Sequence, residues 1–506
     1  MKTKLSAIAL AISLAYAIPA MAAYNDTATI TQTGNNNSTG IEQASATNAT
    51  ATVTQTGDSN TVGTPLAVGI LQNLSSNVTA TISEVGSSNV AGVTQNAMMS
   101  GSASIIQGDS TGNSMSSTAT ISQTKSSNVT SSIKQIGNSN SAKVSQNYVT
   151  GSTTSNGSFS NEVENTKTYF YASWYGDWAA PSYSTASSVN GPYVQGSQQN
   201  SSFANISQSS GNMNTASITQ TNSYNVNAAI GQNGSSNKSN IAQNNISGSI
   251  TNQTSYNGSN TISFDYYTGK QYLDPNNWVA WHTYENDYYD NYLFNQTSNP
   301  ASTSVIQTGN TNSGFIDQET GSNVTATIIQ NGYNNTANIN QIGISGTFSG
   351  NSGNLMIPTS ITSSMATVQQ IDNGNTANIY QYYGVNDIAS INQNGPSNYG
   401  FLQQYSGSQM NGTIEQQGTG NQATVNQLYG DNNNAQTMQH GNNNDAEIFQ
   451  DGASNTAQTF QGGNSNYGYT YQYGANNTAM INQIGSSMSA SIVQSGNMNT
   501  ASILQH

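Results

Sequence analysis

Polar and apolar residues alternate along short stretches of this chain, and these stretches recur. In residues 334–341 (NNTANINQ), Asn, Ala, Ile and Gln alternate with Asn and Thr. A period of two predicts a half-buried β-strand with Asn, Ala, Ile and Gln on its inner face. Glycine takes positive φ without steric cost, so Gly332 and Gly343 are expected to form the flanking turns.

This unit repeats along most of the chain. From Gln439 to Gln505 a glutamine falls every 11 residues in the pattern Q-x-G-x-x-N-x-A-x-φ-x-Q, where φ is apolar. A tandem strand-and-turn unit predicts an all-β fold, a β-solenoid of stacked, amyloid-like parallel sheets with two short strands per coil of about 22 residues. Some units, such as residues 318–330, contain an additional residue, and we interpret the position of Asn323 as a bulge or a longer corner.

The buried amides of this pattern need partners. An unpaired buried amide costs about 1–3 kcal/mol, whereas identical amides stacked one strand apart bond to one another. We therefore expect ladders that fix the register and act in self-assembly, with Glu84 replacing glutamine in one unit. The residues assigned to the ladders are Gln330, Asn335, Gln341, Gln439, Asn444, Gln450, Asn455, Gln461, Gln472, Asn477, Gln483, Gln494, Asn499 and Gln505.

The repeats form blocks separated by segments of different composition. Two lysines, an apolar run and Ala20-Met21-Ala22 predict a secretory signal peptide, and no later segment is long and apolar enough to span a membrane. The expected divisions are a signal peptide (1–22), repeats (23–147), an aromatic insertion (148–194), repeats (195–253), an aromatic and acidic insertion (254–303), repeats (304–343), a Ser/Gly/Met-rich insertion (344–368) and repeats (369–506).

The two larger insertions hold all four tryptophans of the chain. Trp174, Trp178, Trp278, Trp281 and Tyr284 are candidates for binding a surface or a glycan. Alternatively, these rings pack together and fold an excursion that has no core of its own. Nearby carboxylates would suit Ca²⁺ but lack the spacing of a calcium loop, so solvated charges are favoured; they are Asp265, Asp274, Glu285, Asp287 and Asp290.

Charge and composition narrow the function classes. Only 6% of residues are charged and the net charge is −14, which becomes −16 without Lys2 and Lys4. An acidic chain without arginine makes few phosphate contacts, so nucleic acid is not expected as a partner. Without cysteine the chain has neither disulfides nor thiolate zinc sites.

No catalytic, cofactor or metal site is predicted, and we do not expect an enzyme. The histidines lie far apart in sequence, and the carboxylates of the array fall on outward positions, where they suit protection against lateral aggregation. These residues are His282, His440 and His506, and Glu42, Asp317 and Glu447.

The pattern begins in DTATITQTG, soon after the expected cleavage site, and continues to Gln505 with no capping helix or charged plug. Open strand edges are templates for another copy, so end-to-end polymerisation is the favoured hypothesis. The alternatives are a monomeric β-solenoid adhesin that binds glycans through its loops, or an ice-binding protein that uses outward threonines.

The tandem units resemble those of the curlins, the subunits of bacterial curli fibres. The resemblance rests on units such as 416–427, 439–450, 450–461, 472–483 and 494–505 and on the signal peptide. It implies export by an outer-membrane secretion machinery and a place in a curli-like pilus on a Gram-negative-type bacterium. It also implies assembly with itself or related subunits into a functional amyloid that acts in adhesion and biofilm matrix.

Overall fold

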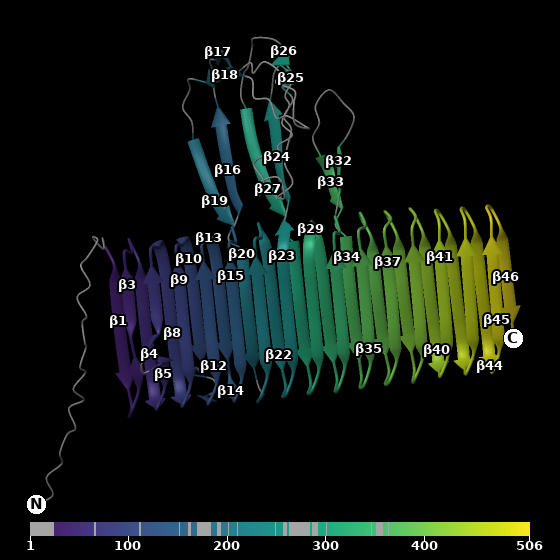
Figure 1. Ribbon diagram of the computed structural model, residues 1–506, viewed down its shortest axis with the longest axis horizontal. Coiled ribbons are helices and arrows are strands. Elements are labelled where there is room, and N and C mark those ends of the chain that lie inside the picture. Colours follow the sequence, from purple (N-terminus) through teal and green to yellow (C-terminus); the bar gives the residue numbers. More distant parts are fainter. Residues whose placement is uncertain are drawn as a thin grey trace, which may run out of the picture.

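The computed structural model confirms an all-β solenoid in which two long parallel sheets face each other (Figure 1). It describes residues 25–64, 67–110, 113–150, 211–247, 301–345 and 364–506. Shorter described segments are 152–159, 163–168, 184–189, 194–200, 202–209, 249–256, 261–262, 284–285, 292–299, 347–350 and 358–362. Consecutive strands alternate between the two sheets, as two strands per coil require.

The first sheet, called sheet 1, begins and ends the solenoid. Its strands, each paired in parallel with the next, are β1 (Thr27–Thr33), β4 (Thr50–Asp58), β8 (Ser76–Ser87), β10 (Met99–Gln107), β13 (Ser127–Gln135), β20 (Ser202–Ser209), β22 (Val226–Asn233), β28 (Ala301–Thr308), β30 (Val324–Asn331), β34 (Ser364–Ile371), β36 (Ile388–Asn394), β38 (Asn411–Gln417), β40 (Asn434–Asn442), β42 (Thr456–Asn464), β44 (Thr478–Ser486) and β46 (Thr500–Gln505).

The opposite sheet, called sheet 2, has the same parallel arrangement. Its first two positions are each split into two short strands, β2 (Ser38–Thr39) with β3 (Ile41–Ala44), and β5 (Thr61–Thr64) with β7 (Ile70–Asn73). The rest are β9 (Val90–Asn96), β12 (Thr118–Thr124), β15 (Ser141–Asn147), β21 (Thr215–Thr221), β23 (Lys238–Ser247), β29 (Ser313–Ser322), β31 (Thr336–Ile342), β35 (Thr376–Tyr382), β37 (Tyr399–Tyr405), β39 (Gln422–Leu428), β41 (Asp445–Asp451), β43 (Tyr467–Tyr473) and β45 (Ser489–Ser495). Short accessory strands are β6 (Ala67–Val68), β11 (Ser114–Met115) and β14 (Gly137–Asn138).

The commonest coil is 23 residues long, one residue more than the predicted 22. Gln393 is 23 residues before its partner Gln416, whereas Gln439 is 22 residues before Gln461. The additional residue lies in the connection from sheet 2 to sheet 1. At Asn323 it takes the left-handed conformation, with φ of 50°, and the next residue, Val324, is buried at that corner. The longer units therefore form a wider corner without changing the register of the strands.

All three insertions leave the solenoid at this type of connection, and their strands project from the same edge (Figure 1). Hairpins from the first and second insertions join through antiparallel pairing of β16 with β27. The resulting four-stranded sheet has the order β19 (Val194–Asn200), β16 (Ser152–Phe159), β27 (Tyr292–Asn299) and β24 (Ser249–Tyr256). The remaining antiparallel pairs are β17 (Val163–Thr168) with β18 (Ser184–Val189), β25 (Thr261–Ile262) with β26 (Tyr284–Glu285), and β32 (Thr347–Gly350) with β33 (Pro358–Thr362).

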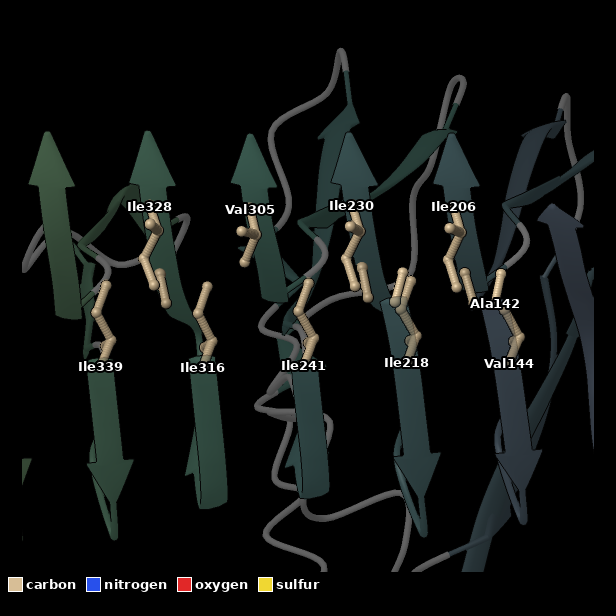
Figure 2. Packing of buried hydrophobic residues seen from close by; sticks show 14 of the residues in the cluster. Ala142, Val144, Ile206, Ile218, Ile230, Ile241, Val305, Ile316, Ile328 and Ile339 are labelled. Atoms are coloured by element: carbon tan, nitrogen blue, oxygen red, sulfur yellow. The ribbon is translucent and has the colours of Figure 1, made fainter. Parts of the chain in front are cut away.

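The core between the sheets is narrow and consists mainly of alanine and β-branched residues. Figure 2 shows Ile206, Ile230 and Ile328 on sheet 1 alternating with Ile218 and Ile241 on sheet 2. These side chains are at most 2% exposed, and each contributes about 1.5–3 kcal/mol on burial. A second, smaller cluster fills the wider corners and comprises Ala46, Ala49, Val78, Met98, Val129, Val149, Val226, Ile246, Val324 and Ile344.

Glycine is required where corners stack closely. The predicted turn residues Gly332 and Gly343 both have positive φ, 135° and 66°. At Gly441, φ is 130° and an added Cβ would collide with the carbonyl oxygen of Gly463 in the next coil. Side chains are thus excluded there by both the backbone conformation and the neighbouring coil.

Gly441→Ala should therefore lower the free energy of unfolding by about 1–3 kcal/mol, since it imposes strain and a clash. The matched control is Gly231→Ala on β22, where an added Cβ meets nothing within 4 Å. Denaturant unfolding of the monomer, followed by circular dichroism, measures both. Equal midpoints for the two variants would contradict this account of the corners.

Candidate assembly site

A ladder of glutamine side chains runs inside each sheet. Gln330 is typical: its Oε1 accepts from Gln307 at 2.8 Å, and its Nε2 donates to Gln370 at 2.9 Å. The second Nε2 hydrogen goes to the carbonyl oxygen of Ser313 in the facing sheet, at 2.9 Å. Each such side chain therefore joins two coils and crosses between the sheets.

The ladders continue past the insertions. Gln135 donates to Gln208, 73 residues later, at 2.8 Å, and Gln232 donates to Gln307, 75 residues later, at 3.0 Å. In sheet 2 the ladder is unbroken from Gln43 to Gln494. Its hydrogen-bonded rungs are Gln43, Gln72, Gln95, Gln123, Gln146, Gln220, Gln243, Gln318, Gln341, Gln381, Gln404, Gln427, Gln450, Gln472 and Gln494.

Asparagines form further columns at the corners. Asn335 donates its backbone N–H to Asn312 Oδ1 at 3.1 Å, and its own Oδ1 accepts from the N–H of Asn375 at 2.9 Å. Its Nδ2 donates to the carbonyl oxygen of Asp372 at 2.7 Å. The asparagine side chain thus forms hydrogen bonds with backbone N–H and C=O groups that a turn would otherwise leave unpaired.

The structure divides the sequence-assigned ladder residues among four columns. The glutamine ladder of sheet 1 contains Gln330, Gln439, Gln461, Gln483 and Gln505, and that of sheet 2 contains Gln341, Gln450, Gln472 and Gln494. Asn335 and Asn444 lie at the corner before sheet 2, and Asn455, Asn477 and Asn499 at the corner before sheet 1.

The ladders have a direction: along both, each Nε2 donates toward the coil that follows in sequence. At the β1 end, Gln32 and Gln43 therefore keep carbonyl oxygens without a partner among the described residues. At the β46 end, Gln494 and Gln505 each use one Nε2 hydrogen, for the carbonyl oxygens of Thr478 and Ser489. One end thus presents acceptors and the other presents donors.

The columns of buried isoleucine side chains are also exposed to solvent at the β1 and β46 ends of the described solenoid. Ile30 of β1, whose equivalents inside the array are buried, is 48% exposed. At the other end Ile503 is only partly buried, beside Ile492. In the described part of the chain, β1 and β46 each have a strand neighbour on one side only.

A family model for the curlin associated repeat matches residues 25–62, 452–485 and 474–506. The matched segments contain the coils at the two ends of the solenoid, with β1 and β4 at one end and β42 to β46 at the other. The chain is a curlin-repeat protein. No curated protein matches it. Curlin repeats are typical of structural subunits rather than enzymes.

One rung of this curlin-repeat protein is acidic. Glu84 is fully buried, and its Oε2 accepts from Gln55 Nε2 at 2.8 Å. On its other side it is paired in register with Gln107, and neither Glu84 Oε1 nor Gln107 Oε1 has a hydrogen-bond partner among the described residues. A proton on Glu84 would supply the missing donor between these two acceptors. Burial raises the pKa of Glu84 from 4.5 to about 8, against the lowering effect of the Gln55 hydrogen bond.

A second buried acid, Asp387, was not identified from the sequence; it lies between Ser364 and Met410 in the column that later coils fill with asparagine. Its Oδ1 accepts from the N–H of Met410 at 3.0 Å, while Oδ2 is buried without a partner. Burial raises its pKa from 3.8 to about 7; the Met410 hydrogen bond lowers the pKa and the nearby charge of Asp431 raises it. Asparagine in this position would place a donor where Oδ2 lies.

Aromatic side chains also lie outside the insertions, on the outer face of sheet 2. Tyr380 lies against Phe401 with ring centroids 5.6 Å apart, and Phe449 stacks on Tyr471 at 5.1 Å. Phe449 and Tyr471 are register partners on neighbouring strands, whereas Tyr380 is a diagonal neighbour of Phe401, whose register partner is Asn378. The alternation of the strands already predicted that these positions face outward.

Several sequence-predicted residues lie outside the described residues or their described side chains. Trp174, Trp178, Trp278, Trp281, His282, Asp265, Asp274, Asp287 and Asp290 lie outside the described residues, and Tyr284 and Glu285 are described only as strand β26. Among the described side chains, no three histidine, aspartate or glutamate residues are placed to hold a metal ion. In the part of the chain that the structure describes, no helix has the length and apolar character to cross a membrane.

The two buried acids predict that stability falls as the pH rises. The folded chain keeps protons that the unfolded chain releases above about pH 4. The contribution of each acid to the free energy of unfolding is therefore complete below its unfolded pKa, which is 3.8 for Asp387 and 4.5 for Glu84. As the pH rises, the stabilising contribution of each acid declines by at most about 1.4 kcal/mol per pH unit. It is lost above about pH 7 for Asp387 and about pH 8 for Glu84.

The variant Glu84→Gln/Asp387→Asn should flatten this dependence and be more stable than wild type at pH 8, because neither position then holds a buried carboxyl group that can ionise. Denaturant unfolding between pH 4 and pH 9 measures the difference. Glu42→Gln, at a half-buried position of β3, is the control and should keep the wild-type slope. An unchanged slope in the double variant would contradict the assignment.

Proposed function

We propose that this chain is a secreted structural subunit of a curli-like extracellular fibre, which grows by adding strands at the open ends of the solenoid. The observation that carries the proposal is the polarity of the ladders, with unpartnered donors at Gln494 and Gln505 and unpartnered acceptors at Gln32 and Gln43. A second copy of the chain supplies the complement of each end.

The match of both end segments to the curlin associated repeat supports the same proposal. The predicted signal peptide and outer-membrane secretion machinery would deliver the subunit to the cell surface, where the fibre acts in adhesion and biofilm matrix. The insertion strands leave along one edge (Figure 1), so they remain accessible for contact with other surfaces, including glycans, when the ends are occupied.

The purified mature chain should form fibres that bind thioflavin T and give reflections near 4.7 Å and about 10 Å, the strand and sheet spacings. A monomer that neither sediments nor seeds fibres would contradict the proposal. Glycan binding by that monomer would support the adhesin alternative instead.

A charge at one open end should separate assembly from folding. Ile503→Lys places an ammonium group where solvent reaches it in the monomer but a second copy would bury it, so elongation should slow by about tenfold or more. Leu504→Lys is the control, because Leu504 points outward and is 57% exposed. Equal elongation rates for the two variants would show that this end takes no part in growth.

A further inference from the structure

Both ends of the solenoid lie in the same sheet. Among the described strands, β1 is the first of the array and β46 the last, and both belong to sheet 1. Successive strands alternate between the sheets, so the strand that would follow β46 in a continuous solenoid lies on sheet 2, beside β45. The array therefore consists of whole coils plus one half-coil.

This half-coil prevents seamless stacking by simple translation. A second copy moved along the axis would place its β1 beside β46 in sheet 1. Its first sheet 2 strands, β2 and β3, would then lie two strand spacings from β45. One strand would be missing, and the backbone groups of β45 and the free amide hydrogen of Gln494 would remain unpaired, at a cost of about 1–3 kcal/mol for each buried group.

A half-turn about the axis removes the gap, because it places β1 of the second copy beside β45 and its β2 and β3 beside β46. Strand direction is opposite in the two sheets (Figures 1 and 2), so the half-turn keeps the new pairs parallel. Residues 489–505 (SASIVQSGNMNTASILQ) then align with residues 27–43 (TATITQTGNNNSTGIEQ) without a gap.

This alignment matches every type of column in the site. The identical pairs are Ala490 with Ala28, Ile492 with Ile30, Gln494 with Gln32, Gly496 with Gly34, Asn497 with Asn35, Asn499 with Asn37, Ile503 with Ile41 and Gln505 with Gln43. The corners also have the same conformation: φ is 106° at Gly496 and 116° at Gly34, and 59° at Met498 and 53° at Asn36.

Hydrogen bonding across this contact repeats what occurs between coils. Within the chain, Asn477 Nδ2 donates to the carbonyl oxygen of Gly496 at 2.8 Å, and the N–H of Asn499 donates to Asn477 Oδ1 at 3.0 Å. Asn499 would do the same toward Gly34 and Asn37 of the second copy. If two β46 ends met, the unpaired Nε2 donors of one copy would face the Nε2 donors of the other and could not bond to them. A tail-to-tail pair is therefore not the favoured contact.

We infer that successive copies in the fibre are related by a half-turn about the fibre axis, with β45 and β46 of one copy paired with β1 and with β2 and β3 of the next. This inference rests on the proposed function, because it describes how that fibre is joined. All three insertions leave one edge of each subunit (Figure 1). They therefore project from opposite edges of the fibre in alternate subunits, and the fibre repeats after two subunits.

Engineered cysteine pairs test the contact, and the absence of native cysteine leaves only the introduced thiols to react. Val493, Leu504 and Thr31 are exposed, outward-facing positions on the terminal strands. The half-turn places Val493 beside Thr31 of the next copy and Leu504 beside Glu42, with Cα atoms about 4.8 Å apart, inside the range a disulfide spans. Translation would place Leu504 beside Thr31 instead.

Fibres of each double variant are collected by sedimentation, oxidised and separated without reductant. T31C/V493C and E42C/L504C should form covalent multimers, with a yield about tenfold or more above that of T31C/L504C, whose thiols are not neighbours. V493C alone is the control for tail-to-tail contact and should remain monomeric.

Multimers of T31C/L504C, dimers of V493C, or fibres in which no pair links would each overturn the half-turn while leaving fibre formation intact. Failure of every variant and of the wild type to form fibres would overturn the proposed function, and the inference with it.

Discussion

The structure depends on one constraint: each buried amide must lie one strand spacing from an equivalent amide. Gln330 meets it with both Nε2 hydrogens donated, to Gln370 and the backbone of Ser313, and with Oε1 accepting from Gln307. The insertions obey it as well, because the chain returns to the same column after 73 residues between Gln135 and Gln208. Apolar burial stabilises the core but is non-directional, so the amides rather than the isoleucines fix the register.

The same constraint gives the molecule its polarity. A ladder of primary amides has a donor end and an acceptor end, whereas the donor and acceptor of each internal rung are paired with its two neighbours. Unpaired groups therefore gather at Gln32 and Gln43 on one side and at Gln494 and Gln505 on the other. Glu84 interrupts the ladder of sheet 1, because its Oε1 faces the Oε1 of Gln107 and no donor lies between the two acceptors.

Local pattern was enough to predict the strands and the amide ladders, because alternation and the 11-residue period are properties of neighbouring residues. The 23-residue coil was not predicted, although the additional residue at Asn323 was identified and the alternating glutamine spacings of 11 and 12 residues, as at Gln381, Gln393 and Gln404, stand in the sequence. The joining of β16 to β27 is a contact between segments far apart in sequence, for which no repeat gives a register. The aromatic candidates for surface binding stay predictions.

Asp387 shows a different limit. It lies between Ser364 and Met410 in a column that later coils fill with asparagine, and its unit departs from the glycine spacing of the repeat, so the position looks like an ordinary exposed turn residue. It is buried because the next coil covers it, where the Met410 N–H donates to its Oδ1. Burial of an acid depends on the neighbouring coil, which the sequence of one unit does not contain.

The most direct test of the ladders is hydrogen exchange of glutamine side-chain amides, measured by NMR. Gln403 and Gln404 are adjacent on β37, yet Gln404 is a fully buried rung that donates to Gln427 at 2.9 Å, and Gln403 points outward. The Nε2 hydrogens of Gln404 should exchange far more slowly than those of Gln403 in monomer and fibre alike, and those of Gln505 should become protected only in the fibre. Equal, fast exchange at Gln403 and Gln404 would contradict the account.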